Sequence, residues 1–447
     1  MRYFNKKHIF LKAFILLLIF ALAGCGILSE GTIIESVTPK DSENISAFGW
    51  VGITFSREVI RETAEDAFLI SPSTKGELFW QGNTLWFRPL QAFNKDTEYL
   101  AHVEGEIETS SGQLISLGHN WTFTVREPDL LYFVPSDKGG EIWRASTDGS
   151  EKKQLSFTEN KLIEFSPDPT GTIIAFTVQN DSGGHDLWLM DREGEDQRLL
   201  LNCEKDVCGE PAWSMDRQTI AYTRELYQEE TNTYLPSQIW TVEIETGSTA
   251  QLYQSDWAFG HAPSFSPDGK RFASYDTTNR GIRILDLETS QESIVPNALP
   301  GSGDWSPDGT KIIFTDLVPA ENEPFVQVFV LDLETNAVDS VLDMGLSDTD
   351  FSQPRWSPDG ESVAVSLRPV NANISKALWV LRLDGLVNRQ ITDDPSATFT
   401  AYEWDPWGAR LIYQRYDLTS SKTSIWLWES GENKMIIENG SRPKWLP

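Results

Sequence analysis

Few residues of this sequence have the types and spacing that catalysis requires. The chain has no Gly-x-Ser-x-Gly turn for a nucleophilic serine, no His-Glu-x-x-His pair for zinc and no Gly-x-x-x-x-Gly-Lys loop for phosphate. It contains five histidines, and for His102 and His119 we expect surface or packing roles. Carboxylates are abundant, but no spacing singles out an acid–base pair. We therefore expect no catalytic residue, no bound metal and no cofactor.

The first cysteine indicates the compartment. Arg2, Lys6 and Lys7 precede an apolar run over 13–23, which is too short to span a bilayer and is typical of a secretory signal. The Leu-Ala-Gly-Cys sequence that follows resembles a bacterial lipobox, which implies cleavage before Cys25 and lipidation of its thiol. The alternative is an ordinary signal with an incidental cysteine. We expect an extracytoplasmic protein anchored by this lipid to the cell membrane or outer membrane of a bacterium.

The other two cysteines, Cys203 and Cys208, are separated by a short polar loop. In an oxidising compartment such a pair indicates a loop-closing disulfide. A metal site is the alternative, but it would need further Cys or His ligands, and this loop contains none.

The composition restricts the partners. The 447 residues carry 66 Asp and Glu against 37 Lys and Arg, a formal charge of −29. A surface of one sign stays soluble and repels nucleic acid and anionic lipid, so neither is expected as the main partner. The hydrophobic fraction of 40% is ample for a buried core, and the length suggests two or three domains.

A repeated turn motif organises residues 128–447. Its clearest copies are the Ser-Pro-Asp-Gly sequences at 266–269, 306–309 and 357–360, where Pro and Asp favour a turn and Gly a left-handed conformation. A short apolar run follows each copy and indicates a buried strand. The aromatic residue before the motif recurs about every 40 to 50 residues, the period of one four-stranded propeller blade. Its positions are Phe165, Trp213, Phe265, Trp305, Trp356, Trp404 and Trp445.

The two ends of this region complete each other. Residues 130–133 supply a second strand without a first, and residues 443–447 supply a first strand without a second. Joined, they would form one shared blade and close a ring of seven, which removes free sheet edges. The Ser-Pro-Asp-Gly copies with Trp in front resemble the propeller repeats of TolB-like proteins and of dipeptidyl-peptidase-type enzymes. The resemblance implies the fold and says little about function.

Residues 33–127 form a separate unit, after a signal peptide at 1–24 and a lipidated linker at 25–32. Short strand-like segments alternate with turns and show no helical period, which predicts a β-sandwich. Several of its pieces together resemble bacterial Ig-like domains, and the resemblance implies a spacer or an adhesion module. The pieces are Val37-Thr38-Pro39 and residues 53–59, 84–89, 96–99 and 122–125.

The long connections of the propeller are the predicted binding surface. Turns between first and second strands are short and uniform, whereas the loops between second and third strands and between successive blades are long and varied. These loops combine carboxylates with aromatic side chains, which suit a glycan or a basic peptide. The alternative for each aromatic residue is packing within its own loop. The candidates are Tyr227, Tyr234, Trp257, Phe259, His261, Phe325, Phe351, Phe399 and Tyr416.

The sequence thus predicts an all-β lipoprotein, in which an Ig-like β-sandwich precedes a seven-bladed β-propeller closed by the N- and C-terminal strands of one shared blade. We expect a non-catalytic binding or scaffolding role in the cell envelope, with a protein or glycan bound by the long loops. The competing class is a lyase or hydrolase that acts on polysaccharide at the central channel.

Overall fold

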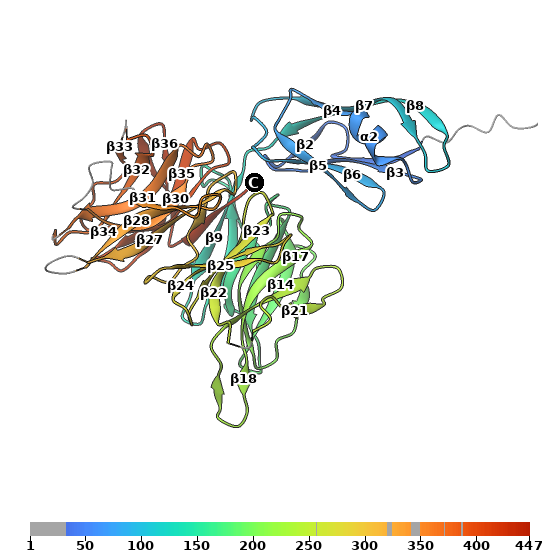
Figure 1. Ribbon diagram of the computed structural model, residues 1–447. Helices are drawn as coiled ribbons and strands as arrows, with labels where there is room; N and C mark the ends of the chain where they lie inside the picture. The colour runs from blue at the N-terminus through green and yellow to red at the C-terminus, as the bar shows by residue number, and fades with distance from the viewer. Residues whose placement is uncertain (1–32, 256, 320–323, 341–348, 371, 386–387) are drawn as a thin grey trace, which may run out of the picture.

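The computed structural model describes residues 33–447 except 256, 320–323, 341–348, 371 and 386–387. Cys25 and the predicted signal peptide lie outside the described residues. The chain forms two β-rich units, seen in Figure 1 as the blue-to-cyan sandwich and the green-to-red group of sheets. Within the described ranges, no helix is long and apolar enough to cross a membrane.

The first unit is a sandwich of two four-stranded sheets. Its strands are β1 (Ile34–Thr38), β2 (Glu43–Ile45), β3 (Val51–Phe55), β4 (Phe68–Ser71), β5 (Gly76–Gln81), β6 (Thr84–Pro89), β7 (Tyr99–Glu108) and β8 (Leu114–Val125). One sheet has the order β1-β3-β6-β5 and the other the order β2-β8-β7-β4. Inward and outward residues alternate, as along β6, and the inward side chains of Tyr99, Trp121 and Phe123 meet in one core.

The sandwich also contains a short helix that the sequence pattern did not predict. α2 (Arg61–Ala67) packs against β7 and buries Ala64 and Ala67. A helix this short shows no repeating apolar face, and Ile60 at its start supplies no side-chain cap. Tertiary packing rather than local propensity therefore stabilises α2.

The second unit consists of four-stranded meanders. Its strands are β9 (Asp129–Pro135), β10 (Gly140–Ala145), β11 (Lys152–Gln154), β12 (Leu162–Pro167), β13 (Ile173–Gln179), β14 (His185–Asp191), β15 (Arg198–Leu201), β16 (Val207–Trp213), β17 (Thr219–Glu225), β18 (Tyr227–Gln228), β19 (Thr233–Tyr234), β20 (Gln238–Glu243), β21 (Thr249–Gln251), β22 (Gly260–Phe265), β23 (Arg271–Asp276), β24 (Gly281–Asp286), β25 (Glu292–Pro296), β26 (Asp304–Trp305), β27 (Lys311–Val318), β28 (Phe325–Asp332), β29 (Val338–Ser340), β30 (Thr349–Trp356), β31 (Ser362–Pro369), β32 (Ala377–Arg382), β33 (Asn388–Gln390), β34 (Ala397–Trp404), β35 (Arg410–Asp417), β36 (Thr423–Glu429), β37 (Glu432–Glu438) and β38 (Ser441–Leu446).

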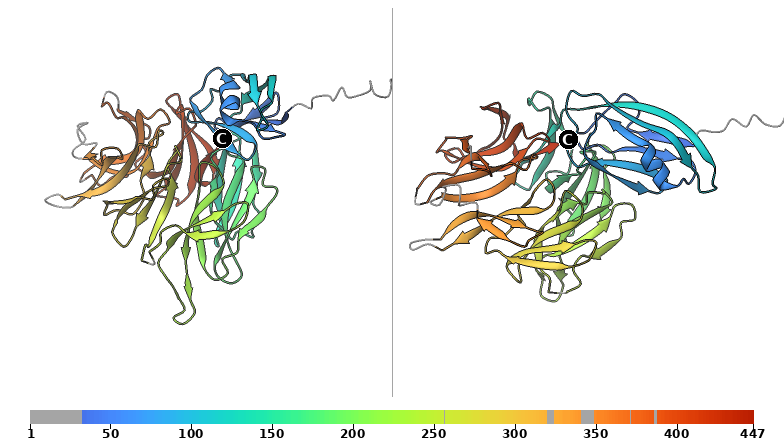
Figure 2. Two further views of the ribbon diagram at one scale, coloured as in Figure 1. Left: turned by 45° about the vertical axis from the view of Figure 1, so that its right-hand side comes forward. Right: turned by 45° about the horizontal axis from the view of Figure 1, so that its top comes forward.

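The meanders follow one another along the chain. β22–β25, β26–β29, β30–β33 and β34–β37 are separate sheets, and the earlier meanders are joined edge to edge in a single sheet that runs from β21 to β38. β38 pairs antiparallel with β9, so the last strand belongs to the meander of β9, β10 and β11. Figure 2 shows the meanders arranged around a common centre, with the sandwich at one side. This arrangement is that of a β-propeller.

Hydrophobic clusters lie between successive meanders. One cluster packs Ile412 and Ile425 of the last separate sheet against Leu130 and Trp445 of the sheet that contains β9 and β38. The other clusters of this unit likewise each draw residues from two neighbouring meanders. Each meander is therefore stabilised through its neighbours on both sides.

The Ser-Pro-Asp-Gly motif forms the turn between the first and second strands. In one copy the Ser306 hydroxyl donates to the Asp308 carboxylate at 2.6 Å, and the Lys311 amide donates to Ser306 Oγ at 2.9 Å. Gly309 has a φ of 71°, which residues with a side chain rarely adopt. Burial opposes ionisation of Asp308, but hydrogen bonds from Ser306 and Thr310 prevail and lower its pKa. The motif therefore builds and rigidifies the scaffold.

The sandwich packs against the side of the propeller that carries these turns, which we call the turn face. The Arg88 guanidinium donates to the Asp268 carbonyl at 3.0 Å, and the Trp407 indole donates to the Phe93 carbonyl at 2.9 Å. Asp268 and Trp407 both lie in turns between a first and a second strand. The opposite side carries the loops between second and third strands and between meanders, and we call it the long-loop face.

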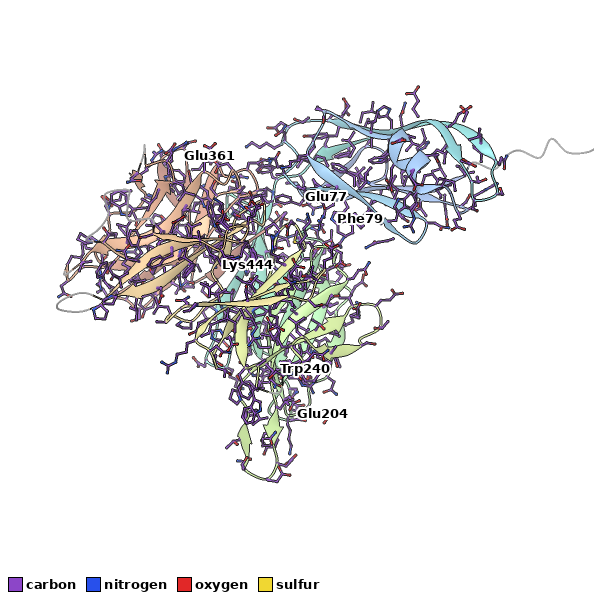
Figure 3. The ribbon with its side chains drawn as sticks, viewed as in Figure 1. Glu77, Phe79, Glu204, Trp240, Glu361 and Lys444 are labelled. Carbon is purple, nitrogen blue, oxygen red and sulfur yellow. A yellow bond between two sulfur atoms is a disulfide. The ribbon has the colours of Figure 1, made fainter. Side chains whose placement is uncertain are left out.

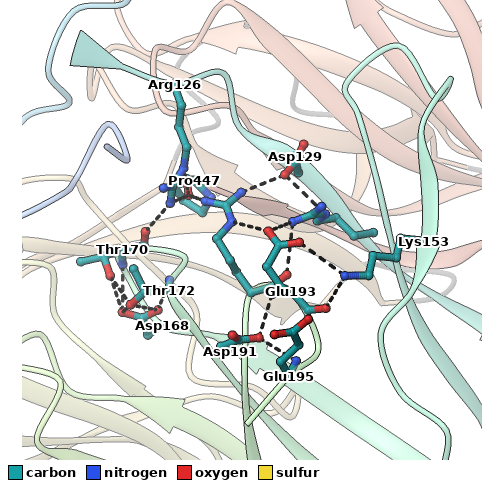
Figure 4. Close-up of polar contacts among 12 residues, drawn as sticks. Arg126, Asp129, Lys153, Asp168, Thr170, Thr172, Asp191, Glu193, Glu195 and Pro447 are labelled. Atoms are coloured by element: carbon teal, nitrogen blue, oxygen red, sulfur yellow. Dashed lines mark hydrogen bonds and ion pairs between the residues drawn. The ribbon is translucent and has the colours of Figure 1, made fainter. Parts of the chain in front are cut away.

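The link between the two units is fastened by charged hydrogen bonds (Figure 4). Arg126 donates to the Pro447 carbonyl at 2.7 Å and to the Thr170 carbonyl at 3.4 Å. Arg192, which donates to the same Pro447 carbonyl at 3.3 Å, also pairs with Asp129 at 2.8 Å. Burial of the guanidinium lowers the pKa of Arg126 to about 10, so it remains charged at neutral pH. These contacts hold the sandwich and the end of β38 together.

Candidate functional site

A central cavity of 960 Å³ lies among the first strands of the meanders. Residues of β12, β16, β22, β30, β34 and β38 line it, together with the segment before β26. The described lining residues include neutral polar side chains such as Gln353 and Gln414. Among the residues that the structure describes, the charged ones that line this cavity are Arg355, Arg442 and Lys444.

A second cavity of 800 Å³ lies between the turn face and the sandwich. Phe48 and Leu90 of the sandwich line one side, and Trp407 lines the other. Arg355 and Lys444 line both cavities, so the two spaces adjoin. The sandwich therefore borders the space at the turn-face end of the central cavity.

Carboxylates on the inner strands tie neighbouring meanders together. The Glu164 carboxylate accepts the Glu210 amide at 2.6 Å, and the Glu210 carboxylate accepts the Ala262 amide at 2.6 Å. Asp304 and Glu403 accept the amides of Trp356 and Trp445 in the same way, at 2.7 and 3.0 Å. Burial raises the pKa of Glu210 and that of Glu403. These acids serve the scaffold, since each joins one inner strand to the next.

The inner strands carry a recurring bulge, and in two of them the bulge residue, Glu210 or Ala262, supplies the amide that the carboxylate accepts. The ladder of first and second strands shifts register at the bulge, as between His261 and Ser264. At this point a residue other than glycine takes a positive φ, a strained conformation that surrounding contacts must hold. The residues concerned are Glu210 (φ 47°), Ala262 (φ 55°), Gln353 (φ 52°), Ala401 (φ 49°) and Arg442 (φ 48°).

Histidines and acids do not gather into a metal centre in the part of the chain that the structure describes. No group of three or more His, Cys, Asp or Glu side chains is placed there to hold an ion. His261, a predicted binding residue, lies on the inner strand β22 and packs against Tyr275, with ring centroids 5.2 Å apart. His185 lies at the start of β14, and burial lowers its pKa, which favours the neutral imidazole.

The structure places Phe351 and Phe399 away from the surface. The sequence pattern assigns them to long connections, but inner strands β30 and β34 begin earlier than expected and include them. Phe351 is 2% exposed and Phe399 is 3% exposed, each within a cluster between meanders. Neither side chain can contact a ligand at the surface as the chain is folded. Phe325 and Tyr416 are half-buried on β28 and β35, in two other meanders.

The remaining predicted residues lie on two adjacent loops of the long-loop face. The loop between β17 and β20 folds into a hairpin, β18–β19, that projects from the propeller (Figure 1). Tyr227 and Tyr234 face each other across it, with ring centroids 5.4 Å apart, and Tyr234 is exposed. The sequence pattern indicated a long loop here but not the hairpin.

The loop after β21 lies against the stem of this hairpin. Gln238 and Phe259 form an isolated bridge, and the Gly260 amide donates to the Ser237 carbonyl at 2.8 Å. Phe259 packs edge-on against Trp257 at 6.2 Å, and Trp257 is 75% exposed. An indole this exposed makes no contribution to the core and is available to a partner.

A disulfide between Cys203 and Cys208 closes a loop next to the hairpin. Within this loop the Asp206 carboxylate accepts the Tyr227 amide at 2.9 Å. Lys205 lies 4.8 Å from the centroid of the Tyr227 ring and pairs with Glu229 at 2.6 Å. Figure 3 labels Glu204 of the same loop near the base of the projecting hairpin. The disulfide loop thus supports the hairpin from one side.

Several exposed apolar residues of the long-loop face were not predicted. Sequence reasoning selected aromatic residues of the longest loops and so passed over aliphatic residues and a shorter connection. One feature of the sequence could have identified them. Each is an apolar residue in a connection whose residues do not alternate between apolar and polar as they would in a strand. They are Phe157 (73% exposed), Ile374 (51%), Leu418 (51%) and Leu235 (37%).

These two units define the class of the protein: an all-β chain in which an Ig-like sandwich docks on a β-propeller. Residues 30–125 match the family model of the bacterial Ig-like domain. Among curated proteins, an uncharacterized protein of Agrobacterium fabrum is 24% identical over 258 residues, which cover 55% of this chain and 82% of that protein.

Two solved structures resemble the chain at low identity. TolB from Acinetobacter baumannii is 16% identical with a TM-score of 0.43, over 85% of this chain and 83% of that chain. An acylaminoacyl peptidase from Pyrococcus horikoshii is 14% identical with a TM-score of 0.50, over 77% of this chain and 51% of that chain. Likeness at such identity concerns the fold alone. The predicted resemblance to TolB-like propellers, behind a bacterial Ig-like domain, is confirmed.

Proposed function

We propose that this protein is a non-catalytic binding protein of the bacterial cell envelope and that it captures its partner with the long-loop face of the propeller. The observation that carries the proposal is the exposure of large apolar side chains there. Trp257 is 75% exposed and Phe157 is 73% exposed, and burial of such side chains stabilises a complex. The sandwich contacts the opposite face, so the long-loop face is the side turned away from it.

A protein partner fits this face better than a glycan. A glycan site needs aromatic rings that lie flat around one groove, whereas here Tyr234 and Trp257 stand on separate loops beside aliphatic Leu235. Ile374 and Leu418 extend the apolar surface to other meanders. Mixed aromatic and aliphatic residues with a polar surround are typical of the centre of protein–protein interfaces.

The proposal includes an architecture and an anchor. We infer limits of 33–127 for the Ig-like domain and 128–447 for the propeller, and a propeller of seven blades in a closed ring. The pairing of β38 with β9 and the cluster around Trp445 support closure. Lipid on Cys25 would hold the protein at the membrane, with the Ig-like domain as the spacer.

The test is partner capture by the mature chain with altered loops. A Trp257→Ser, Tyr234→Ser variant should lose capture of an envelope protein, because it removes the exposed rings that a partner would bury. The captured protein is identified by mass spectrometry from a cross-linked envelope extract. Its affinity for the wild type and the variant is then measured with purified components.

The matched control is a Leu69→Ser, Leu114→Ser variant, which removes exposed apolar side chains from the Ig-like domain instead. It should bind the partner as the wild type does. Equal capture by the loop variant and the wild type would contradict the proposal. If the loop variant instead lost binding to a purified glycan that the wild type binds, the long-loop face would be assigned to a glycan.

A second candidate function is cleavage of a polysaccharide in the central channel. The observation that favours it is the proximity of Glu164 to Glu210, because burial raises the pKa of Glu210 and general acid catalysis is helped by a raised carboxyl pKa. Both carboxylates already accept amides of the next strand, which favours the scaffold role. Loss of product formation in a Glu210→Gln variant that folds normally would support the enzyme.

A further inference from the structure

The central cavity carries positive charge inside a strongly negative protein. The whole chain has a formal charge of −29, yet the described residues that line the 960 Å³ cavity include three cations and no carboxylate. Figure 3 labels Lys444 near the middle of the propeller. Carboxylates of the same inner strands, such as Glu164 and Glu403, accept backbone amides and are not among the lining residues, so the cations are the charged groups that face the cavity.

Two inner strands bring these cations together. Arg442 and Lys444 come from β38, and Arg355 comes from β30. The Arg442 guanidinium donates to the Ile163 carbonyl at 2.6 Å and lies 3.8 Å from the centroid of the Phe133 ring. These two contacts hold Arg442 in place, and Glu164 is the carboxylate whose charge acts on it.

The three cations differ in how closely a carboxylate pairs with them. Arg355 pairs with Asp304 at 2.9 Å, and 51% of its side chain is still exposed. Arg442 and Lys444 form no close ion pair in the part of the chain that the structure describes, but the charge of Glu164 favours charged Arg442, and Lys444 favours the ionised form of Glu403. Burial lowers the pKa of Arg442, which indicates a partly desolvated charge. A bound anion would pair with these two cations more closely than Glu164 and Glu403 do.

We propose that the central cavity is a binding site for a small organic anion that carries carboxylate or phosphate groups. Arg442 and Lys444 contact the charged group, and Arg355 completes its surroundings. The neutral polar residues Gln353 and Gln414 serve the uncharged part of the ligand. The volume of 960 Å³ lies in the range of about 300 to 1,000 Å³ that small-molecule sites occupy.

The ligand enters from the long-loop face, because the sandwich borders the space at the other end of the cavity. The anion site uses none of the exposed residues assigned to partner capture. Anion binding in the cavity and partner capture by the long-loop face are therefore independent proposals, and an experiment can refute one without refuting the other.

The test is calorimetric titration of the mature chain with citrate and, separately, with inorganic phosphate. The titration is run at about 10 mM ionic strength, where charge attraction is screened only over about 30 Å. The wild type should bind at least one of these anions. A Lys444→Glu variant should bind at least about tenfold more weakly, which corresponds to about 1.4 kcal/mol. The ratio of the two affinities shows whether carboxylate or phosphate is preferred.

Three controls make the outcome decisive. Lys434→Glu makes the same charge change at an exposed position of β37 and should bind as the wild type does. Lys444→Gln removes the charge without reversal and serves if the Glu variant unfolds. The Trp257→Ser, Tyr234→Ser variant should keep anion binding. Absence of binding to both anions, or equal binding by wild type and the Lys444 variants, would overturn the proposal.

Discussion

Asp417 shows how a single carboxylate can stabilise a loop of the long-loop face. It accepts the Ser420 amide at 2.8 Å, the Ser420 hydroxyl at 2.9 Å and the Arg415 guanidinium at 3.0 Å. These hydrogen bonds, with that of the Ser420 amide largest, lower the pKa of Asp417 to about 2. The folded chain thus favours the ionised carboxylate.

The pH dependence of stability follows from this shift. A lowered pKa in the folded state contributes stability above the unfolded value of about 4, and that contribution is lost as the pH falls toward about 2. An Asp417→Asn variant should therefore be less stable than the wild type at neutral pH, and the difference should shrink as the pH falls from about 5 to about 2. Urea unfolding across this range measures it. Parallel curves for the two proteins would contradict the assignment.

Residue by residue, the positions of the candidate side chains could be predicted in part, and their role in binding stays a prediction. Four of the predicted residues do lie on neighbouring loops, because both kinds of long connection lie on the same face of the propeller. They are Tyr227, Tyr234, Trp257 and Phe259. Phe351 could not be placed, because the length of an inner strand depends on pairing with the next strand and not on local pattern. The cations that line the central cavity were also missed. They come from β30 and β38, and only the packing of the meanders brings these strands close together.

Among the elements, the loop closed by Cys203 and Cys208 supports the hairpin β18–β19. It carries Asp206 and Lys205, which hold the Tyr227 side of the hairpin. The hairpin itself makes few other contacts in the described structure, being a two-stranded ribbon that projects from the propeller. Isolated hairpins are marginally stable in water, so this support decides whether it is ordered.

A Cys203→Ser, Cys208→Ser variant should lower the free energy of unfolding by about 2 kcal/mol, the value typical of a disulfide that closes a short loop. Amide exchange over β18 and β19 should accelerate more than exchange elsewhere, because the support is local. Hydrogen-exchange mass spectrometry compares the hairpin with β7 of the Ig-like domain as internal control. Unchanged exchange in the hairpin would show that the loop does not support it.

Most elements could be predicted from the turn motifs that bound them. Each Ser-Pro-Asp-Gly copy marks the end of a first strand and the start of a second, as at Trp305 and Lys311. The helix α2 and the hairpin β18–β19 were missed for one reason. Both are too short for a periodic pattern and exist through contacts with residues distant in sequence.

At the scale of the whole molecule, β38 is the element on which the others depend. Trp445 is 3% exposed, and its indole donates to the Glu403 carbonyl at 3.2 Å. It packs with Leu130 and Ile412, so it bridges the first and last meanders. The sequence predicted this pairing because each end of the region lacks the strand that the other supplies.

A Trp445→Ala variant should be destabilised by about 3 to 5 kcal/mol, as expected for loss of a buried indole. Exchange of the β9 amides should rise with it, since β9 would lose its partner edge. The matched control is Trp121→Ala, which removes a buried indole from the Ig-like domain and should leave β9 exchange unchanged. If β9 stayed protected in the Trp445 variant, the contact would be local and would not close a ring.

The β9–β38 pairing also bears on how the protein is made. Ser441 and Phe133, which meet across this ladder, are 308 residues apart in sequence. During synthesis, the edge of β9 is therefore exposed while nearly all of the remaining chain is still to come. An unpaired strand edge can pair with other chains. The nascent chain is therefore most prone to aggregation just before β38 leaves the ribosome. We expect a holding chaperone to bind this long-lived intermediate.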